Sequence, residues 1–449
     1  MEPLADDDSP DPSQHDPTHD PATPWDVVVV GAGAAGLIAA TQAAERGRRT
    51  LLLEKNARPG VKILMSGGTR CNLTQSTDKW GIVRAYGEQG SFLHSALAVL
   101  APSDLVKLIE QEGVPTKVEE TGKIFPVSNK ATDILAALMR RFERSSAEIG
   151  LREPLAAVAR NGDLFRLTTA KRELQTRSLI ITTGGKSYPG SGTTGDGYAW
   201  ASAFGHTIVP PRPALVPITT NVAWVQGLTG LTIGDVDVRV VISDRALAAE
   251  RLEMLPTGGK GKKQPFLAQQ RGSFLFTHFG LSGPTVLDVS RAVTGCPRPE
   301  LLDLVCDFLP DVSAESLDEQ LRQECAVEGK KQVVGVAARH VPRRLAETLL
   351  AECDLSLELR GADFAKRDRA RLVAAIKHSR IPVSGTRGFA KAEVTAGGVA
   401  LREVDSHTLQ SKLLPGLFFA GEVLDLDGPI GGYNFQAAFS TGMLAGMSA

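Results

Sequence analysis

One segment near the start of the chain constrains the fold more than any other. Residues 26–30 (DVVVV) have the apolar pattern of a buried strand, 31–36 (GAGAAG) that of a tight turn, 37–47 that of a helix, and 50–54 (TLLLE) that of a second strand. This order is typical of dinucleotide-binding domains, because free N–H groups and the positive end of the helix dipole meet an anion at the turn. The sequence therefore predicts an α/β, Rossmann-like domain with a dinucleotide site.

Individual residues of this segment are expected to have separate structural roles. Gly31 allows the tight turn, Gly33 lets the backbone approach a pyrophosphate, and Gly36 lets helix and strand pack closely. Glu54 ends the second strand, where its carboxylate can accept hydrogen bonds from a ribose hydroxyl and would repel a 2′-phosphate. Because FAD, NAD and NADP all bind such a turn, the choice among them depends on other parts of the chain.

Three other segments bear on that choice. Residues 54–72 form a loop rich in Gly, Ser, Asn and cations, which suits a long anionic cofactor. Residues 177–185 predict a buried strand that ends in TTGG and brings backbone against the cofactor. Residues 417–425, followed by GPIGGYNFQAAFSTG, predict a further strand, an acid and a glycine-rich helix start. The end of the chain is therefore expected to return to the first domain.

The chain is long enough for more than one domain. Its 449 residues are about three times the length of a typical domain. We expect four parts, namely an acidic, disordered tail (1–24), the first part of the cofactor-binding domain (25–204), an insert (205–389) and the C-terminal part of the cofactor-binding domain (390–449).

The insert itself shows two patterns. Its first part, 205–310, is expected to be β-rich, because residues 231–240 alternate apolar and polar side chains. Its second part, 311–380, has apolar residues at helical spacing, with Pro342 as a helix boundary. The insert is therefore expected to combine a small barrel or sandwich with a helical subdomain.

The charge of the chain is nearly balanced, with 50 Lys and Arg against 51 Asp and Glu. Seven of the acids lie in 1–24, which leaves a net charge of +6 on the remainder. This balance makes no strong electrostatic demand for nucleic acid or anionic lipid, so we expect neither as a partner. No segment has the length of a membrane span, and the five cysteines include no CxxC pair and no zinc-ligand spacing. We therefore expect a cytoplasmic protein without a metal site. The sequence leaves its oligomeric state open.

These segments resemble the BaiN-type family of NAD(P)/FAD-dependent oxidoreductases, also described as aminoacetone oxidase family FAD-binding enzymes, within the two-dinucleotide-binding flavoproteins. The motifs that carry the resemblance are GAGAAGL (31–37), EKN (54–56), KILMSGGTRCN (62–72), TTGGKSYPGSGTTGDGY (182–198), FTHFGLSGP (276–284) and GEVLDLDGPIGGYNFQ (421–436). The family pattern reads SGGGRCN, whereas this chain has Thr69 in place of the third glycine. If this position has a positive φ, a β-branched residue is strained there.

The resemblance implies an α/β fold in which a Rossmann-like FAD-binding domain carries an inserted β-barrel plus helical subdomain that caps the flavin. It implies FAD as the cofactor, with its pyrophosphate on 31–36, its ribose on Glu54, and its flavin ring near 66–72 and 431–436. The residues expected to bind the cofactor are Gly31, Gly33, Ala34, Ala35, Gly36, Glu54, Lys55, Lys62, Ser66, Gly67, Arg70, Cys71, Asn72, Thr183, Gly184, Gly185, Gly421, Glu422, Gly431, Gly432, Asn434 and Phe435.

No catalytic base can be assigned from the sequence. Cys71 lies in the flavin loop without a nearby resolving cysteine, which favours a structural role over a catalytic thiol. His278, beside FTHFGLSGP, and His378 are candidate substrate-facing groups, although a lone His is more often structural. Tyr433 is a further weak candidate through the specific GGYNFQ string, where it is expected to contact the flavin.

We expect an FAD-dependent oxidoreductase that transfers hydride or electrons to or from a small or medium organic substrate. No second GxGxxG is present, so NAD(P)H would act as a transient co-substrate in the flavin cleft, with oxygen as the alternative acceptor. The family's names point both to reduction of enone-type double bonds and to amine oxidation.

Two alternatives to this function stay open. One is an FAD-dependent nucleic-acid (tRNA) modifying protein, suggested by the +6 remainder and the basic run 258–263. The other is a non-catalytic flavin-binding protein, suggested by the missing base.

Overall fold

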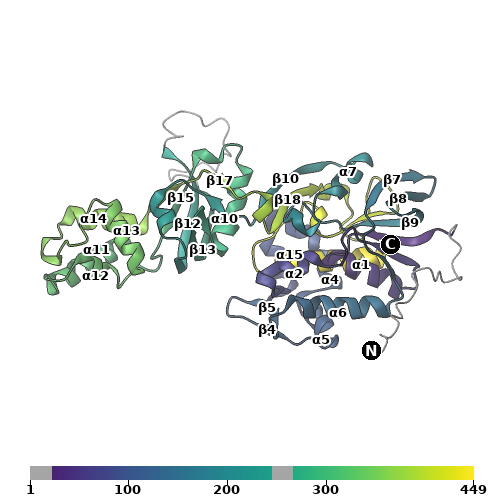
Figure 1. Cartoon of the computed structure of the whole chain (residues 1–449), viewed down its shortest axis with the longest axis horizontal. Helices are drawn as coiled ribbons and strands as arrows, with labels where there is room; N and C mark the ends of the chain where they lie inside the picture. Colours follow the sequence, from purple (N-terminus) through teal and green to yellow (C-terminus); the bar gives the residue numbers. More distant parts are fainter. Residues whose placement is uncertain (1–22, 245–265) are drawn as a thin grey trace, which may run out of the picture.

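The computed structural model describes residues 23–244 and 266–449. The predicted tail (1–24) falls almost entirely outside the described residues, and the basic run 258–263 falls entirely outside them. The molecule is elongated, with a Rossmann part at one end, a second sheet in the middle and a cluster of helices at the other end (Figure 1). This arrangement confirms the α/β fold class with an inserted β and helical unit.

The Rossmann part is built on a sheet that joins strands from both ends of the chain. In the order β6-β2-β1-β9-β8-β7, with β19 beside β9, its strands are β6 (Glu148–Gly150), β2 (Thr50–Leu53), β1 (Trp25–Val30), β9 (Glu173–Ile181), β8 (Leu164–Thr169), β7 (Leu155–Asn161) and β19 (Leu417–Phe419). Val30 aligns in parallel with Leu53 and with Ile181, and Phe419 aligns in parallel with Ile181. The carboxyl ends of these strands therefore open onto one edge, where α/β sheets bind their ligands.

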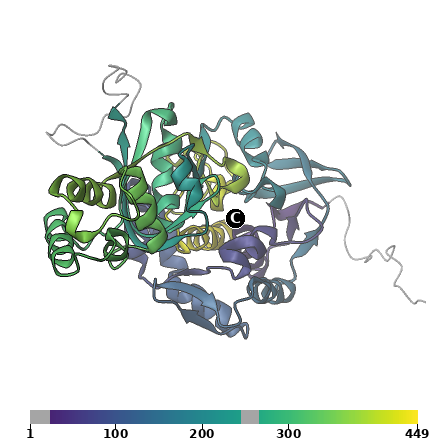
Figure 2. The ribbon, with the colours of Figure 1, turned by 60° about the vertical axis from the view of Figure 1, so that its left-hand side comes forward.

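Two helices from opposite ends of the sequence pack closely in the centre of the Rossmann part. They are α1 (Ala34–Glu45), which follows the glycine-rich turn, and α15 (Tyr433–Ser448). A Cβ on Gly442 would collide with the carbonyl oxygen of Ala35. Figure 2 shows α15, in yellow, in the middle of the molecule. The last segment of the chain thus packs on α1, which follows the first strand.

Shorter elements complete the Rossmann part around this core. They are α2 (Val61–Thr69), β3 (Thr74–Gln75), α3 (Lys79–Ala85), η1 (Gly87–Leu93), α4 (His94–Val99), α5 (Pro102–Gln111), β4 (Thr116–Val118), β5 (Lys123–Pro126), α6 (Ala131–Arg144), η2 (Pro189–Ser191), α7 (Asp196–Ala203), η7 (Leu401–Glu403) and η8 (Gly421–Val423). The helical turns of α2 were not expected from the sequence, which predicted a loop over 54–72.

One described stretch, Gly87–Gln111, is long and apolar enough to cross a membrane by length and composition alone. Half of its apolar window is buried inside the protein. It comprises η1, α4 and α5, and the backbone leaves the helical region at Leu100, with φ −142° and ψ 85°. The stretch is thus a series of short helices in the core, with α4 packed on α15.

The second sheet lies in the predicted β-rich part of the insert. In the order β16-β15-β12-β13-β14-β11-β17, its strands are β16 (Ser379–Pro382), β15 (Leu302–Asp307), β12 (Thr232–Ile242), β13 (Phe266–Thr277), β14 (Gly280–Ser282), β11 (Ile218–Thr219) and β17 (Gly385–Thr386). Only Val383 and Ser384 separate β16 from β17, so the sheet curls until its first and last strands approach each other. The sheet packs against α10 (Pro284–Gly295) and α8 (Ala223–Gly227).

The helical part of the insert follows the predicted spacing. Its helices are α11 (Ala314–Val327), α12 (Val333–Ala337), α13 (Arg343–Glu352) and α14 (Lys366–Lys377), with η5 (Gly361–Asp363) before α14. Leu317 and Leu321 are fully buried, and Pro342 is the N-cap of α13, as expected for a helix boundary. In Figure 1 these helices lie at the end of the molecule opposite the Rossmann part.

The two parts are joined by an antiparallel ribbon of β10 (Ile208–Ala214) and β18 (Val394–Val399). The 3-10 turn η6 (Phe389–Lys391) lies just before β18. The chain therefore enters and leaves the insert along neighbouring strands. The domain boundaries near 205 and 389 stay predictions.

We expect Gly442→Val to weaken the packing of α15 on α1, because its side chain would meet the backbone of Ala35. The free energy of unfolding should fall by about 1–3 kcal/mol, measured by urea denaturation. Gly335→Ala in α12 is the matched control, because an added Cβ there makes only ordinary contacts with Lys331. It should leave that free energy unchanged or higher. Equal effects of the two substitutions would contradict a close α1–α15 contact.

Candidate functional site

A cavity of about 530 Å³ opens at the edge of the Rossmann sheet where the parallel strands end. Most residues predicted to bind the cofactor line it, namely Gly31, Gly33, Ala34, Ala35, Glu54, Lys55, Lys62, Ser66, Gly67, Arg70, Asn72, Thr183, Gly184, Gly421, Glu422, Gly431, Gly432, Asn434 and Phe435. Gly36, Cys71 and Gly185 do not line it. The tertiary fold thus brings together segments that lie up to four hundred residues apart in the chain.

The glycine-rich turn has the geometry that a close ligand requires. Gly31 has a φ of 104°, and a Cβ there would lie 2.8 Å from the carbonyl oxygen of Thr182. A Cβ on Gly36 would collide with the carbonyl of Gly31, so this glycine serves the packing of helix against strand. Gly33 is different, because nothing lies within 4 Å of its Cβ position. Gly33 therefore leaves a space at the N-terminus of α1 that a pyrophosphate can fill.

Glu54 is fixed at the base of the turn. Its side chain is buried, and its carboxylate accepts hydrogen bonds from the backbone N–H groups of Ala32 and Asn56, each at 2.8 Å. A carboxylate has about four lone-pair sites, so acceptor capacity remains for a diol. The residues present therefore fit a dinucleotide with a free ribose.

The SGGTRCN segment leaves helical geometry inside α2. Ser66 is extended, and Gly67 and Gly68 have φ values of 55° and 66°. Thr69 and Cys71 are also left-handed, with φ values of 68° and 60°. The family's glycine position does have a positive φ here, so Thr69 takes a conformation that is strained for a β-branched residue.

Cys71 does not line the cavity. Its side chain is fully buried, and burial raises the pKa of its thiol to about 12, partly opposed by a hydrogen bond with Ser66. A thiol with this pKa is protonated at neutral pH and is a poor nucleophile. This environment is that of a structural cysteine.

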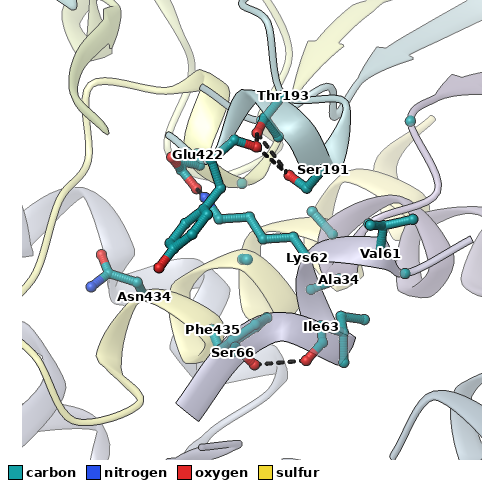
Figure 3. A pocket seen from close by; sticks show the side chains of 18 of the residues that line it. Ala34, Val61, Lys62, Ile63, Ser66, Ser191, Thr193, Glu422, Asn434 and Phe435 are labelled. Carbon is teal, nitrogen blue, oxygen red and sulfur yellow. Dashed lines mark hydrogen bonds and ion pairs between the residues drawn. The ribbon is translucent and has the colours of Figure 1, made fainter. Parts of the chain in front are cut away.

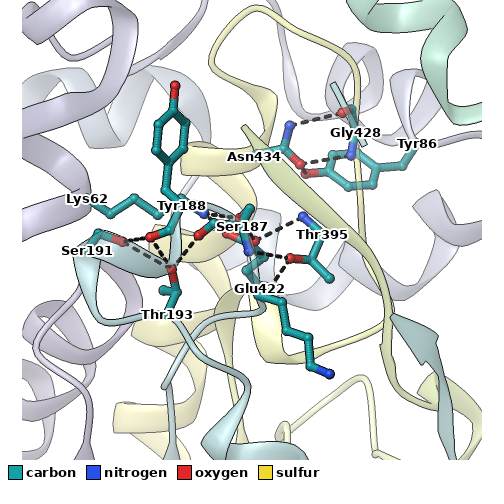
Figure 4. Close-up of polar contacts among 11 residues, drawn as sticks. Lys62, Tyr86, Ser187, Tyr188, Ser191, Thr193, Thr395, Glu422, Gly428 and Asn434 are labelled. Atoms are coloured by element: carbon teal, nitrogen blue, oxygen red, sulfur yellow. Dashed lines mark hydrogen bonds and ion pairs between the residues drawn. The ribbon is translucent and has the colours of Figure 1, made fainter. Parts of the chain in front are cut away.

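One carboxylate joins several segments beside the cavity. Lys62 reaches from α2 across the cavity to Glu422 in η8, with Nζ and Oε2 at 2.5 Å (Figure 3). The other oxygen of Glu422 accepts from the Ser187 hydroxyl at 2.5 Å and from the Thr395 backbone N–H at 3.0 Å (Figure 4). Lys62 and Glu422 therefore belong to one hydrogen-bond network, which connects α2, the TTGG segment, β18 and η8.

Hydrogen bonds of Asn434 and Tyr86 stabilise the GGYNFQ segment and the loop before it. The Asn434 amide donates to the Gly428 carbonyl and accepts from its N–H, each at 2.9 Å (Figure 4). The Tyr86 hydroxyl donates to the Tyr433 carbonyl at 3.1 Å. Gly431 and Gly432 have φ values of 133° and 93°, so the chain turns sharply into α15. Asn434 therefore shapes the loop and also lines the cavity.

The predicted catalytic candidates lie outside the cavity wall. His278 is exposed in the turn between β13 and β14, with its ring 5.0 Å from the Phe279 ring. His378 is exposed directly after α14, and Tyr433 begins α15 without lining the cavity. The structure thus does not bring these side chains together at the cofactor cavity.

Several polar residues that line the cavity were not singled out from the sequence. Among them are Tyr188, Lys123 and Glu393. Tyr188 belongs to the quoted string TTGGKSYPGSG, and Glu393 directly precedes the strand β18. Lys123 carries no local signal, since it lies in β5 of a small hairpin. Asp288 was also missed; its carboxylate accepts from the Ile430 N–H at 2.8 Å, and burial raises its pKa to about 6.

The chain is similar to several known proteins. The ribosomal RNA dihydrouridine synthase of Escherichia coli (strain K12) is 34% identical over 421 residues, which cover 93% of this chain and 96% of that protein. The 3-dehydro-bile acid delta(4,6)-reductase of Clostridium scindens is 28% identical over 428 residues, covering 94% and 98%. The solved structure of 3-ketosteroid-delta4-(5alpha)-dehydrogenase from Rhodococcus jostii RHA1 is similar with a TM-score of 0.47 and 14% identity, covering 96% of this chain and 98% of that chain.

These relatives include an RNA-modifying enzyme and a small-molecule reductase. The expectation that nucleic acid is not a partner is therefore not confirmed. The expected family and cofactor are confirmed, because the model of the HI0933-like protein Rossmann domain matches residues 25–448. The chain belongs to the HI0933-like family of FAD-dependent, Rossmann-fold oxidoreductases.

Proposed function

We propose that this protein reduces a carbon–carbon double bond conjugated to a carbonyl, and that its acceptor is a uracil ring in ribosomal RNA. The observation that carries this proposal is the 34% identity to a ribosomal RNA dihydrouridine synthase over nearly the full length of both chains. The Haemophilus influenzae protein of the same name is 32% identical over 429 residues. In this proposal the RNA-modifying interpretation, with ribosomal RNA in place of tRNA, replaces the small organic substrate as the first candidate.

The chemistry implied by the relatives' names is the same in both cases. Dihydrouridine is a uridine in which the C5–C6 double bond of the uracil ring, conjugated to the C4 carbonyl, has been saturated. A delta(4,6)-reductase of a 3-oxo bile acid likewise saturates double bonds conjugated to a ketone. In each, a hydride adds to the carbon remote from the carbonyl and a proton to the carbon beside it. FAD, once bound and reduced, would supply the hydride, and NAD(P)H is the donor that we propose for its reduction.

The residues of the cavity suit this cofactor and this class of acceptor. Gly33 and the N-terminus of α1 would hold the pyrophosphate, and Glu54 the ribose. Lys123 lines the cavity as a cation whose ammonium has no ion pair in the described residues, which favours an anionic nucleotide and draws electron density towards a carbonyl oxygen. Lys62 and Arg70 also line the cavity, where they are paired with Glu422 and Glu119. The net charge of +6 outside residues 1–24 also favours an RNA partner over a neutral one.

A small-molecule enone is the second candidate. It is favoured by the 28% identity to the bile acid reductase, which also extends over nearly the whole of both chains. The two candidates share the cofactor and the hydride-transfer step, so they differ only in what binds outside the flavin.

The first experiment uses the purified, FAD-loaded protein with NADH or NADPH, unmodified ribosomal RNA transcribed in vitro, and in parallel a 3-oxo-4-ene steroid. We expect rapid bleaching of the flavin by one nicotinamide, and dihydrouridine in the RNA, detected by nucleoside mass spectrometry as a gain of two hydrogens. Steroid reduction without dihydrouridine would select the second candidate. Bleaching without either product would contradict the proposed function.

A second experiment tests the cofactor cradle. Gly33→Val should place its side chain in the space that a pyrophosphate fills, because nothing else lies within 4 Å of this Cβ position. We expect at least about a tenfold rise in the Kd for FAD, or about 1.4 kcal/mol, measured by fluorescence titration of the apoprotein. Gly234→Val in β12 is the control, because its Cβ position is equally open but lies away from the cavity. Equal FAD affinities of the two variants would contradict this placement of the pyrophosphate.

A further inference from the structure

Glu393 differs from every other acid in the wall of the cavity. The other acids there are each held by a hydrogen bond or an ion pair, namely Glu54 by Ala32 and Asn56, Glu119 by Arg70, Glu153 by Arg172, Asp196 by Lys55, and Glu422 by Lys62. Within residues 23–244 and 266–449, the Glu393 carboxyl has neither kind of partner. It is thus the cavity acid that is available to a bound molecule.

The backbone holds Glu393 firmly even though its side chain is unpartnered. Its N–H donates to the Leu215 carbonyl at 3.1 Å, and its neighbours Ala392 and Val394 are buried. Glu393 lines the cavity and is exposed to it, while the protein around its carboxyl desolvates that group. An acid that is fixed at its backbone and open at its carboxyl is suited to contact a substrate.

The surroundings of Glu393 set its protonation. The groups that face it are Lys62 from α2, Lys123 from β5, Tyr188 before η2 and Asp288 from α10. Desolvation by the surrounding protein raises the pKa of Glu393 above its usual range, although Lys62 and Lys123 oppose this effect. A carboxyl with a raised pKa stays protonated nearer to neutral pH, as a general acid requires.

Other candidate acids near the cavity are less suitable. The buried Cys71 thiol, with a pKa of about 12, does not line the cavity. Burial also raises the pKa of Tyr188 above that of an ordinary phenol, so it gives up its proton less readily. Asp288 does not line the cavity, and Lys62 is engaged by Glu422.

We infer that Glu393 is the catalytic acid that protonates the substrate carbon beside the carbonyl, an inference that rests on the proposed reductase function. As the hydride from the reduced flavin bonds to the remote carbon, the Glu393 O–H bond breaks and a C–H bond forms at the carbon next to the carbonyl. The double bond is thereby saturated, the flavin is left oxidised, and Glu393 is left as a carboxylate. Solvent reprotonates it through the cavity. Lys123, whose ammonium has no hydrogen bond or ion pair in the described part of the chain, stabilises the charge that develops on the carbonyl oxygen.

The test is Glu393→Gln in the FAD-loaded protein, which keeps the shape of the side chain but removes the acid. We expect dihydrouridine formation to fall by about a hundredfold or more. The rate of flavin bleaching by NAD(P)H and the affinity for the RNA, measured by filter binding at fixed salt, should both stay within about twofold, because neither needs this proton. Glu120→Gln is the matched control, because Glu120 is exposed in the turn between β4 and β5 and does not line the cavity. It should match the wild type in all three measurements.

The pH profile adds a second readout. Because only the protonated carboxyl can donate, the wild-type rate should be constant below the raised pKa of Glu393 and fall about tenfold per pH unit above it. The Gln variant should lack this limb. Dihydrouridine formation by Glu393→Gln within about twofold of the wild type, or an unchanged limb, would overturn the assignment while leaving the proposed function intact. A wild-type protein that forms no reduced product would instead overturn the proposed function, and the assignment with it.

Discussion

The structure around the cofactor depends on the carboxylate of Glu422. Its two oxygens receive Lys62 from one end of the chain, Ser187 from the middle and Thr395 from beyond the insert. The same segments also contact one another, because the Lys62 ammonium donates to the Ser187 hydroxyl at 2.6 Å and the Ser187 N–H donates to the Thr395 hydroxyl at 3.1 Å. The side chains of Lys62 and Glu422 are only partly exposed, at 23% and 18%. Charge-assisted hydrogen bonds at such a site are stronger and more directional than those at the surface. The shape of the cavity therefore depends on Glu422 as well as on the glycines that line it.

The insert is tied to the same region through α10. Arg291 contacts the Asp427 carboxylate at 2.6 Å, and one turn earlier Asp288 accepts from the Ile430 N–H. Both partners lie in the loop that leads into the GGYNFQ turn. The β subdomain is therefore fixed to the loop at the cavity rather than attached only through its connecting strands, and the helices α11–α14 extend away from this anchor (Figure 1).

The elements of the fold could be predicted where the signal is local. The valines of β1, the glycines before α1 and the alternation in β12 each produce their structure from a short window of sequence. The glycine motifs likewise pointed to most of the cavity wall. Glu393 and Lys123 could not be found this way, because an acid before a strand and a lysine in a hairpin acquire meaning only when tertiary contacts bring them to one cavity. His278 was singled out because it lies in a specific motif, yet that motif forms a turn of the second sheet. A motif can be specific to a family for reasons of folding alone.

The ribbon of β10 and β18 has a mechanical consequence. Glu393 directly precedes β18, so this acid belongs to the ribbon that joins the Rossmann part to the insert. The glycine-rich turn and Glu54, by contrast, belong to the rigid core of the Rossmann sheet. A rotation of the insert about this ribbon would displace Glu393 together with the loop 427–430, which Arg291 and Asp288 hold, but not the glycine-rich turn and Glu54. Binding of the pyrophosphate and ribose therefore depends on the Rossmann core, whereas the position of the proton donor depends on the orientation of the insert.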